Sequence, residues 1–173
     1  MTSPELDNGC CIEQRLVGWA DPVIGALRAA GLSLVTAESC TGGLIAAILS
    51  HGKGASDCLH GGFVAYTKAH KAEVLGVDRA LLDRQGAVNA AVARQMADGA
   101  LQRSVASVAL SVTGVLGPDA DPDGNPAGLL YFAIARKGTS TEVWRQEFKN
   151  MQPDEVRRAA VLYALETMYG NFR

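Results

Sequence analysis

The chain has 173 residues, of which 48% are hydrophobic and 20% are charged. A chain of this length buries roughly 70% of its unfolded surface, which predicts one globular domain, with two as the alternative, and no need of disulfides or metal for stability. The 16 Lys and Arg residues and the 18 Asp and Glu residues give a formal net charge of −2. That charge excludes a protein that holds nucleic acid through a broadly basic surface.

The sequence favours a cytoplasmic protein that does not enter a membrane. Its apolar runs, such as residues 44–49, are far shorter than the ~20 residues that a membrane-spanning helix needs. Residues 1–9 carry acidic but no basic side chains, unlike a secretory signal. The four cysteines form no C-x-x-C pair, so we expect reduced thiols at Cys10, Cys11, Cys40 and Cys58.

Hydrophobic spacing, helix caps and glycines predict helices and strands in alternation. A loop rich in Gly, Pro and Asp, residues 114–128, interrupts this pattern and is long enough to indicate a functional role. An α/β fold with a mixed sheet covered on both faces follows from the order of elements. We expect helices over 21–30, 44–50, 68–75, around 81–82, from the Asn89 cap past 100, and over 153–170, with strands over 32–37, 63–66, 107–113, 129–135 and 142–148.

Common catalytic signatures are missing from the sequence. It contains no G-x-x-x-x-G-K-[ST] segment, which excludes a P-loop ATPase, and no G-x-S-x-G elbow of the α/β-hydrolases. His51, Cys58, His60 and His70 show no recognised ligand spacing. We therefore expect solvated or capping histidines and no metal site.

Two glycine loops follow predicted strands. In the first, ESCTGG over 38–43, a glycine pair enters a helix, where backbone N–H groups and the helix dipole could meet a phosphate. The same pattern suits a plain strand-to-helix turn, and the spacing leaves both open. The second loop, TGVLG over 113–117, leaves another strand at the edge where ligands of open α/β sheets bind. The two loops could line one crevice.

Ser56, Tyr66 and Lys71 contain the groups of a serine hydrolase. A desolvated lysine can lose its charge and act as the base that activates a serine hydroxyl, and a tyrosine can relay a proton or orient the lysine. The alternative is a helix cap, a core-edge tyrosine and a surface charge. Spacing alone favours that alternative.

Seven segments follow one another along the chain: TAESCTGG (36–43), GAS (54–56), GGFVAYTKAHKAEVLGV (61–77), GAV (86–88), MADGA (96–100), SVTGVLGPD (111–119) and PAG (126–128). In this order they resemble the CinA C-terminal family. The resemblance implies a single domain over 1–173, with a loose tail at 1–12. It also implies a three-layer α/β/α sandwich with a mixed, mostly parallel sheet, assembled as a homo-oligomer, either a dimer or a trimer.

The activity implied by the resemblance is that of a stand-alone nicotinamide-nucleotide amidase, which acts without a cofactor or metal. It would convert nicotinamide mononucleotide to nicotinate mononucleotide and ammonia in pyridine-nucleotide recycling. The family's nucleophile, tyrosine and general base fall on Ser56, Tyr66 and Lys71. With them we expect the substrate to contact Ser39, Thr41, Gly42, Gly43, Thr113 and Gly114.

The chain departs from the family at three places. Thr67 and Lys68 replace Ser-Asn and add a cation near Lys71, where a like charge would either lower the pKa of that lysine or disrupt the pocket. Asn89 and Ala90 replace a serine and a glutamate, and the loop over 114–128 carries extra bulky and acidic residues. These changes motivate an alternative function, a catalytically weak nucleotide-binding or regulatory module.

Overall fold

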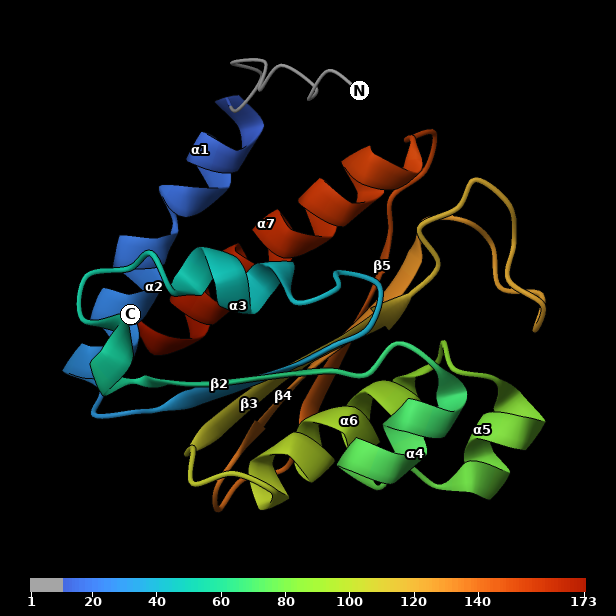
Figure 1. Ribbon diagram of the computed structural model, residues 1–173, viewed down its shortest axis with the longest axis horizontal. Helices are drawn as coiled ribbons and strands as arrows, with labels where there is room; N and C mark the ends of the chain where they lie inside the picture. The colour runs from blue at the N-terminus through green and yellow to red at the C-terminus, as the bar shows by residue number, and fades with distance from the viewer. Residues whose placement is uncertain (1–10) are drawn as a thin grey trace, which may run out of the picture.

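A five-stranded sheet lies between two layers of helices (Figure 1). The computed structural model describes residues 11–173, so the loose tail expected over 1–12 falls almost wholly outside the described residues. Four helices cover one face of the sheet: α1 (Cys11–Val17), α2 (Ala20–Ala29), α3 (Leu44–Leu49) and α7 (Pro153–Phe172). Three cover the other face: α4 (Lys68–Leu75), α5 (Arg79–Gln85) and α6 (Ala90–Gln102). The predicted three-layer α/β/α architecture is confirmed.

The sheet is mixed, with one strand opposed to the others. Its spatial order is β2 (Leu59–Val64), β1 (Leu34–Glu38), β3 (Val108–Gly114), β4 (Leu129–Arg136) and β5 (Glu142–Glu147). β1 runs parallel to β2 and β3, whereas β4 is antiparallel to β3 and β5. β4 alone therefore points the opposite way, as a mixed, mostly parallel sheet predicts. Because the chain leaves β1 toward β2 on one side and later returns as β3 on the other, a crevice forms at the carboxyl ends of β1 and β3.

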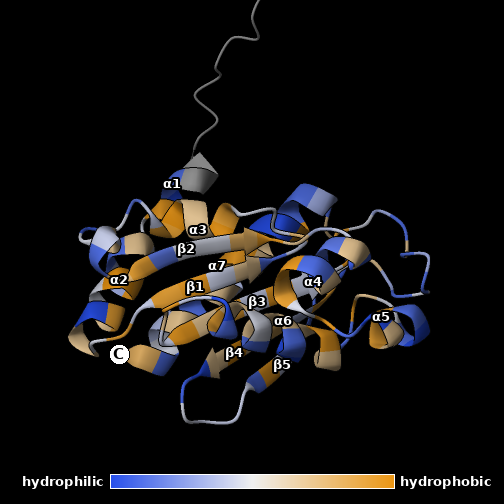
Figure 2. Ribbon diagram, turned by 60° about the horizontal axis from the view of Figure 1, so that its bottom comes forward, coloured by the Kyte–Doolittle hydropathy of each residue, from blue (hydrophilic) through white to orange (hydrophobic). Residues whose placement is uncertain are grey.

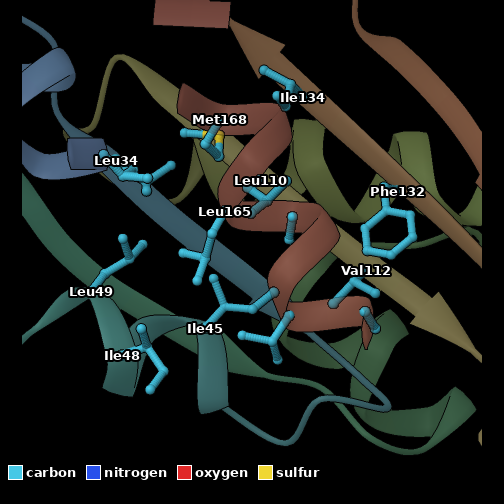
Figure 3. Packing of buried hydrophobic residues seen from close by; sticks show 14 of the residues in the cluster. Leu34, Ile45, Ile48, Leu49, Leu110, Val112, Phe132, Ile134, Leu165 and Met168 are labelled. Atoms are coloured by element: carbon cyan, nitrogen blue, oxygen red, sulfur yellow. The ribbon is translucent and has the colours of Figure 1, made fainter. Parts of the chain in front are cut away.

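Each face of the sheet buries its own hydrophobic core. Strands rich in apolar residues run between the two helical layers (Figure 2). On the α7 side, Leu165 and Met168 pack against Leu110 of β3 and Ile45 of α3 (Figure 3). On the other face, the buried residues of α6 cover β3 and β4. Full burial of each Leu, Ile or Met side chain contributes about 1.5–3 kcal/mol, so both helical layers are firmly attached to the sheet.

Three elements differ from the sequence-based expectation, and the first is α1 (Cys11–Val17), which was not predicted. The second strand was predicted over 63–66, but β2 spans Leu59–Val64 and includes Gly61 and Gly62. A Cβ at Gly62 would lie 2.4 Å from Thr36 Oγ1 of the neighbouring strand. Gly62 therefore serves close approach between strands, whereas Gly61 has open space around it and a φ of 142°. In addition, a short 3-10 helix, η1 (Ala55–Asp57), precedes β2.

Polar side chains cap the helices on the α6 side. Thr67 accepts from the N–H of His70 at the start of α4, and Asp78 accepts from the N–H of Ala80 at the start of α5. Asn89 accepts from the N–H of Val92 and so begins α6, as predicted. A side chain in this position stabilises a helix by about 1 kcal/mol. The departure at Asn89 is therefore a helix cap.

Candidate active site

A cavity of about 470 Å³ opens at the carboxyl ends of β1 and β3. This is the size range of small-molecule sites, and the position is the one that the strand order favours. Its walls come from the loops after β1 and β3, the start of α4, the residues before α6, and the first turns of α7. The lining residues are Ser39, Cys40, Tyr66, Lys68, Lys71, Ala87, Val88, Thr113, Gly114, Val115, Leu116, Gly117, Asp121, Pro122, Asp123, Pro153 and Arg157.

The loop after β1 is organised by the carboxylate of Glu38. This side chain is 1% exposed and lies against the first turn of α3. Its oxygens accept five hydrogen bonds, which offset the cost of burying a charge. The donors are Thr36 Oγ1 (3.0 Å), Thr41 Oγ1 (2.7 Å) and the backbone N–H groups of Gly43 (3.1 Å), Ile45 (3.0 Å) and Ala46 (2.9 Å).

This arrangement leaves few hydrogen-bond donors of the glycine loop available to a phosphate. The hydroxyl of Thr41 and the N–H of Gly43 donate to Glu38, and the N–H of Gly42 donates to the carbonyl of Ser39. None of these three residues lines the cavity. The structure therefore does not support our prediction that Thr41, Gly42 and Gly43 cradle the substrate. Their loop makes the turn from β1 to α3.

Lys71 forms the base of the cavity. It follows the Thr67 cap in the first turns of α4, and only 1% of its surface is exposed. Its Nζ donates to Ser39 Oγ at 2.7 Å, to the carbonyl of Ala65 at 2.9 Å and to the carbonyl of Tyr66 at 3.1 Å. Among the ion pairs of the described residues, none includes Lys71. The amine therefore sits in a buried, uncompensated position.

Burial controls the ionisation of the two side chains beside Ser39. Loss of hydration lowers the pKa of Lys71 from 10.5 to about 8. The Lys68 charge is not among the causes of this shift, contrary to our expectation. Burial also raises the pKa of the Cys40 thiol to about 12, against the influence of the Lys71 charge. Lys71 can lose its proton near neutral pH, whereas Cys40 stays a thiol and is no nucleophile.

The structure does not bring Ser56 to Lys71. Ser56 lies in η1, exposed, and its hydroxyl contacts Asp57 at 3.4 Å. That position precedes β2, whereas Lys71 contacts the residues that follow it. The six residues of β2 separate the two ends by about 20 Å. Ser56 lines a different depression, so the predicted trio is not assembled.

Tyr66 does approach Lys71, but through its backbone. The carbonyl of Tyr66 accepts from Lys71 Nζ, while the side chain is 69% exposed and lines the cavity mouth. The expected role of the phenol in orienting the lysine is therefore played by a peptide oxygen.

Two predicted binding residues lie on the opposite wall. The hydroxyl of Thr113 donates to the carbonyl of Ala87 at 2.9 Å, which fixes the end of β3 to the segment before α6. Gly114 is needed for packing, because a Cβ there would lie 2.4 Å from Leu130 Cγ. Both residues line the cavity, so a ligand would contact them mainly as part of the cavity wall.

Charged side chains surround the cavity mouth. Lys68 at the start of α4 pairs with Asp123 of the 114–128 loop at 2.8 Å. Asp121 accepts from the N–H groups of Asp123 and Asn125 and from the side-chain amide of Asn125, so its carboxylate organises the loop itself. Arg157 approaches from α7. This region is therefore a charged rim around an inner Ser39–Lys71 pair.

Sequence reasoning placed Ser39 among the binding residues and missed Glu38 and Arg157. The signal for Ser39 was present, because it follows β1 at the edge where Lys71 arrives after the neighbouring strand β2. In residues 11–173 we find no group of three or more His, Cys, Asp or Glu placed to hold a metal ion. Nor does any helix in that range have the length and apolar character to cross a membrane.

Comparison with known proteins places the whole cavity inside a region of similarity. Residues 18–172 match the family model of the CinA C-terminal domain. A nicotinamide-nucleotide amidohydrolase, PncC, of Shigella flexneri is 38% identical over 160 residues, which are 92% of this chain and 96% of that protein. The match includes both loops that line the cavity and the start of α7.

Solved structures share the fold over nearly the same length. The competence/damage inducible protein CihA of Agrobacterium tumefaciens superposes with a TM-score of 0.84 at 37% identity, covering 90% of this chain and 94% of that one. A competence-damaged protein (CinA) superfamily protein of Klebsiella pneumoniae superposes with a TM-score of 0.86 at 32% identity, covering 91% and 97%.

Proposed function

The chain belongs to the CinA C-terminal domain family, as its sequence segments predict, and we propose that it hydrolyses the carboxamide of nicotinamide mononucleotide. The products are nicotinate mononucleotide and ammonia. The observation that carries this proposal is the buried contact of 2.7 Å between Lys71 Nζ and Ser39 Oγ at the base of a cavity. A serine beside a lysine of lowered pKa is an arrangement that supports acyl transfer.

Ser39 replaces Ser56 as the proposed nucleophile. The neutral amine of Lys71 takes the proton of the Ser39 hydroxyl as Oγ attacks the amide carbon. The Lys71 ammonium then gives this proton to the departing nitrogen, and ammonia leaves an acyl ester on Ser39. Lys71 next takes a proton from water, whose oxygen attacks the ester, and returns it to Ser39 Oγ.

The residue after Ser39 supplies a donor for the oxyanion. Cys40 lines the cavity, and within residues 11–173 no other residue accepts a hydrogen bond from its backbone N–H. We assign this N–H to the oxygen of the substrate amide, which gains negative charge when Oγ attacks. Removal of one such donor in other enzymes lowers kcat by about 10²–10³.

Ammonia release from nicotinamide mononucleotide tests the proposal, with Ser39→Ala and Lys71→Met as the active-site variants. Loss of either group should reduce kcat at least about 10³-fold, because the two act as one unit. Ser56→Ala is the matched control, since it removes an exposed hydroxyl at the other end of β2. We expect it to retain full activity.

The alternative function has a distinct outcome in the same experiment. A nucleotide-binding or regulatory module would bind nicotinamide mononucleotide but release no ammonia from the unmodified chain. That result would overturn the amidase proposal. Activity lost in Ser56→Ala but kept in Ser39→Ala would overturn the assignment of the nucleophile.

A further inference from the structure

A loop tip that forms part of the cavity wall is bonded mainly to itself. Residues 117–125 follow β3, and Pro122 is among the residues that they contribute to the lining. The carboxylate of Asp121 accepts hydrogen bonds from the N–H groups of Asp123 and Asn125 and from the Asn125 side chain. Backbone bonds within the same segment complete the turn. These contacts fix the shape of the tip, but they do not fix its position against the rest of the cavity.

One ion pair joins this tip to α4. Lys68 Nζ donates to Asp123 Oδ1 at 2.8 Å. Among the described residues, no other hydrogen bond or ion pair connects residues 117–125 to another part of the chain. The two side chains are 41% and 27% exposed, so water screens their attraction only in part. Since Lys68 begins the helix that carries Lys71, the ion pair sets the position of the tip relative to the proposed base.

The second oxygen of the same carboxylate occupies a space left by a glycine. Gly86 ends α5, is buried and has a φ of 74°. A Cβ at Gly86 would collide with Asp123 Oδ2. In Figure 1 the loop between β3 and β4 extends beyond the strands on the side where α5 lies. The Asp123 side chain is therefore received between α4 and the end of α5, with matching charge on one side and matching shape on the other.

We infer that Lys68 and Asp123 are positioning residues for nucleotide binding, an inference that rests on the proposed function. Their ion pair holds the tip in place as a wall before the ligand arrives, so that binding does not have to order the tip. Neither residue takes part in the proton transfers between Lys71 and Ser39. Two of the departures noted in the sequence, Lys68 and the acidic loop, are thus one contact that supports the cavity.

Turnover of nicotinamide mononucleotide by Lys68→Met and Asp123→Asn tests this inference. In each variant KM should rise about three- to tenfold while kcat stays within about twofold, because only the binding wall is loosened. The double variant should be no worse than either single variant, since both changes remove the same ion pair. Asp83→Asn is the matched control, because this exposed carboxylate lines a groove beside Lys68 and has no ion pair in residues 11–173. Its KM should not change.

The direction of the change in Asp123→Asn separates positioning from direct ligand binding by Lys68. If Lys68 itself bound the anionic group of the nucleotide, loss of the Asp123 charge would free its ammonium and KM would fall. A KM that falls or stays unchanged in Asp123→Asn would overturn the inference. Effects of the two single variants that multiply in the double variant would also overturn it, because the two residues would then act separately.

Limited proteolysis measures the position of the tip without turnover. Endoproteinase Asp-N cleaves on the amino side of aspartate, which occurs at every second position from 119 to 123. Without ligand, cleavage in this segment should be about three- to tenfold faster in Lys68→Met than in the unmodified chain. Lys53→Met removes an exposed lysine that has no ion pair within the described part of the chain, and it should be cleaved at the unmodified rate.

The two readouts separate this inference from the proposed function. Equal cleavage of all three proteins would overturn the positioning role of the ion pair, even where ammonia is released. Faster cleavage of Lys68→Met in a chain that releases no ammonia would support the tethered tip and overturn the amidase.

Discussion

Lys71 Nζ and Ser39 Oγ lie 2.7 Å apart, although 32 positions separate the residues in the chain. The same set of atoms satisfies both protonation states of the lysine. As an ammonium, Lys71 donates three hydrogen bonds, to Ser39, Ala65 and Tyr66. As a neutral amine, it donates two to the carbonyl oxygens and accepts one from the serine hydroxyl. A proton can therefore pass between the two residues with no movement of either side chain.

The first prediction concerns the pH dependence of turnover. Because Lys71 acts as a base and its pKa is about 8, kcat/KM for nicotinamide mononucleotide should rise tenfold per pH unit below that value and level off above it. Ammonia release measured from pH 6 to 9.5 checks this. A profile that is flat between pH 6.5 and 8.5 would contradict a neutral lysine base.

Lys68→Met is the control for the cause of the lowered pKa of Lys71. Burial lowers the pKa of Lys71, and the Lys68 charge is not among the causes. The variant should keep the midpoint of the profile within about 0.3 pH units, since Asp123 already neutralises Lys68. An upward move of a full unit would show instead that Lys68 repels the Lys71 charge.

The same burial predicts how stability depends on pH. Between about pH 8 and 10.5, Lys71 is neutral when folded and charged when unfolded, so the unfolded chain binds more protons. The contribution of Lys71 to the free energy of unfolding must therefore rise with pH across that window. Below the window the folded chain holds the buried charge, and the destabilisation that it causes is complete. From pH 7.5 to 9.5 the gain is about 2 kcal/mol.

Urea unfolding of the unmodified chain and of Lys71→Met at those two pH values isolates this contribution. The methionine fills much of the same space but cannot titrate. The free energy of unfolding of the unmodified chain should increase relative to the variant by the stated amount. A constant difference between the two proteins would mean that Lys71 keeps its ordinary pKa.

Sequence patterns predicted most of the fold because its elements carry local signals. The cap at Asn89 and the glycines after helices marked helix ends that the structure places within a few residues. The start of β2 was not predicted because Gly61 and Gly62 look like a turn. The role of Gly62 depends on the approach of Thr36 from another strand, and no local pattern in the sequence shows such a contact.

The site was harder to predict because its contacts are between distant segments. Lys71 was identified, but its partner was placed at Ser56, 15 residues away, rather than at Ser39. Strand pairing decides the question, since β1 and β2 run parallel and bring their carboxyl ends together. The sequence also does not show that the Glu38 carboxylate turns back onto the glycine loop and accepts its hydrogen bonds.

A further prediction concerns the buried carboxylate of Glu38. In Glu38→Gln, an amide nitrogen must face backbone N–H donors that now have no acceptor, and the charge that strengthens five hydrogen bonds is lost. We expect a loss of about 2–4 kcal/mol in the free energy of unfolding. Urea denaturation checks this, with Glu73→Gln on exposed α4 surface as the control. Equal stability of both variants would argue against a structural role for the carboxylate.

Two glycines inside helices should respond oppositely to alanine. Gly99 of α6 has no room, because a Cβ there would collide with the carbonyl of Leu75 at the end of α4. The backbone of α4 would have to move, so Gly99→Ala should lower the free energy of unfolding by about 1–3 kcal/mol. Gly25 of α2 has nothing within 4 Å of the same point and is exposed. Gly25→Ala should therefore raise stability by about 0.5–1 kcal/mol.

Because α4 carries Lys71, the displacement caused by Gly99→Ala should also reach the active site. We expect kcat for ammonia release to fall about tenfold in Gly99→Ala, since a shift of 1 Å at a catalytic group can cost about 10² in rate. Gly25→Ala should leave kcat unchanged, because α2 lies on the other face of the sheet. Thermal unfolding and turnover measured on both proteins decide the matter. A Gly99→Ala protein as active and as stable as the unmodified chain would show that α4 and α6 are not in the close contact on which the position of Lys71 depends.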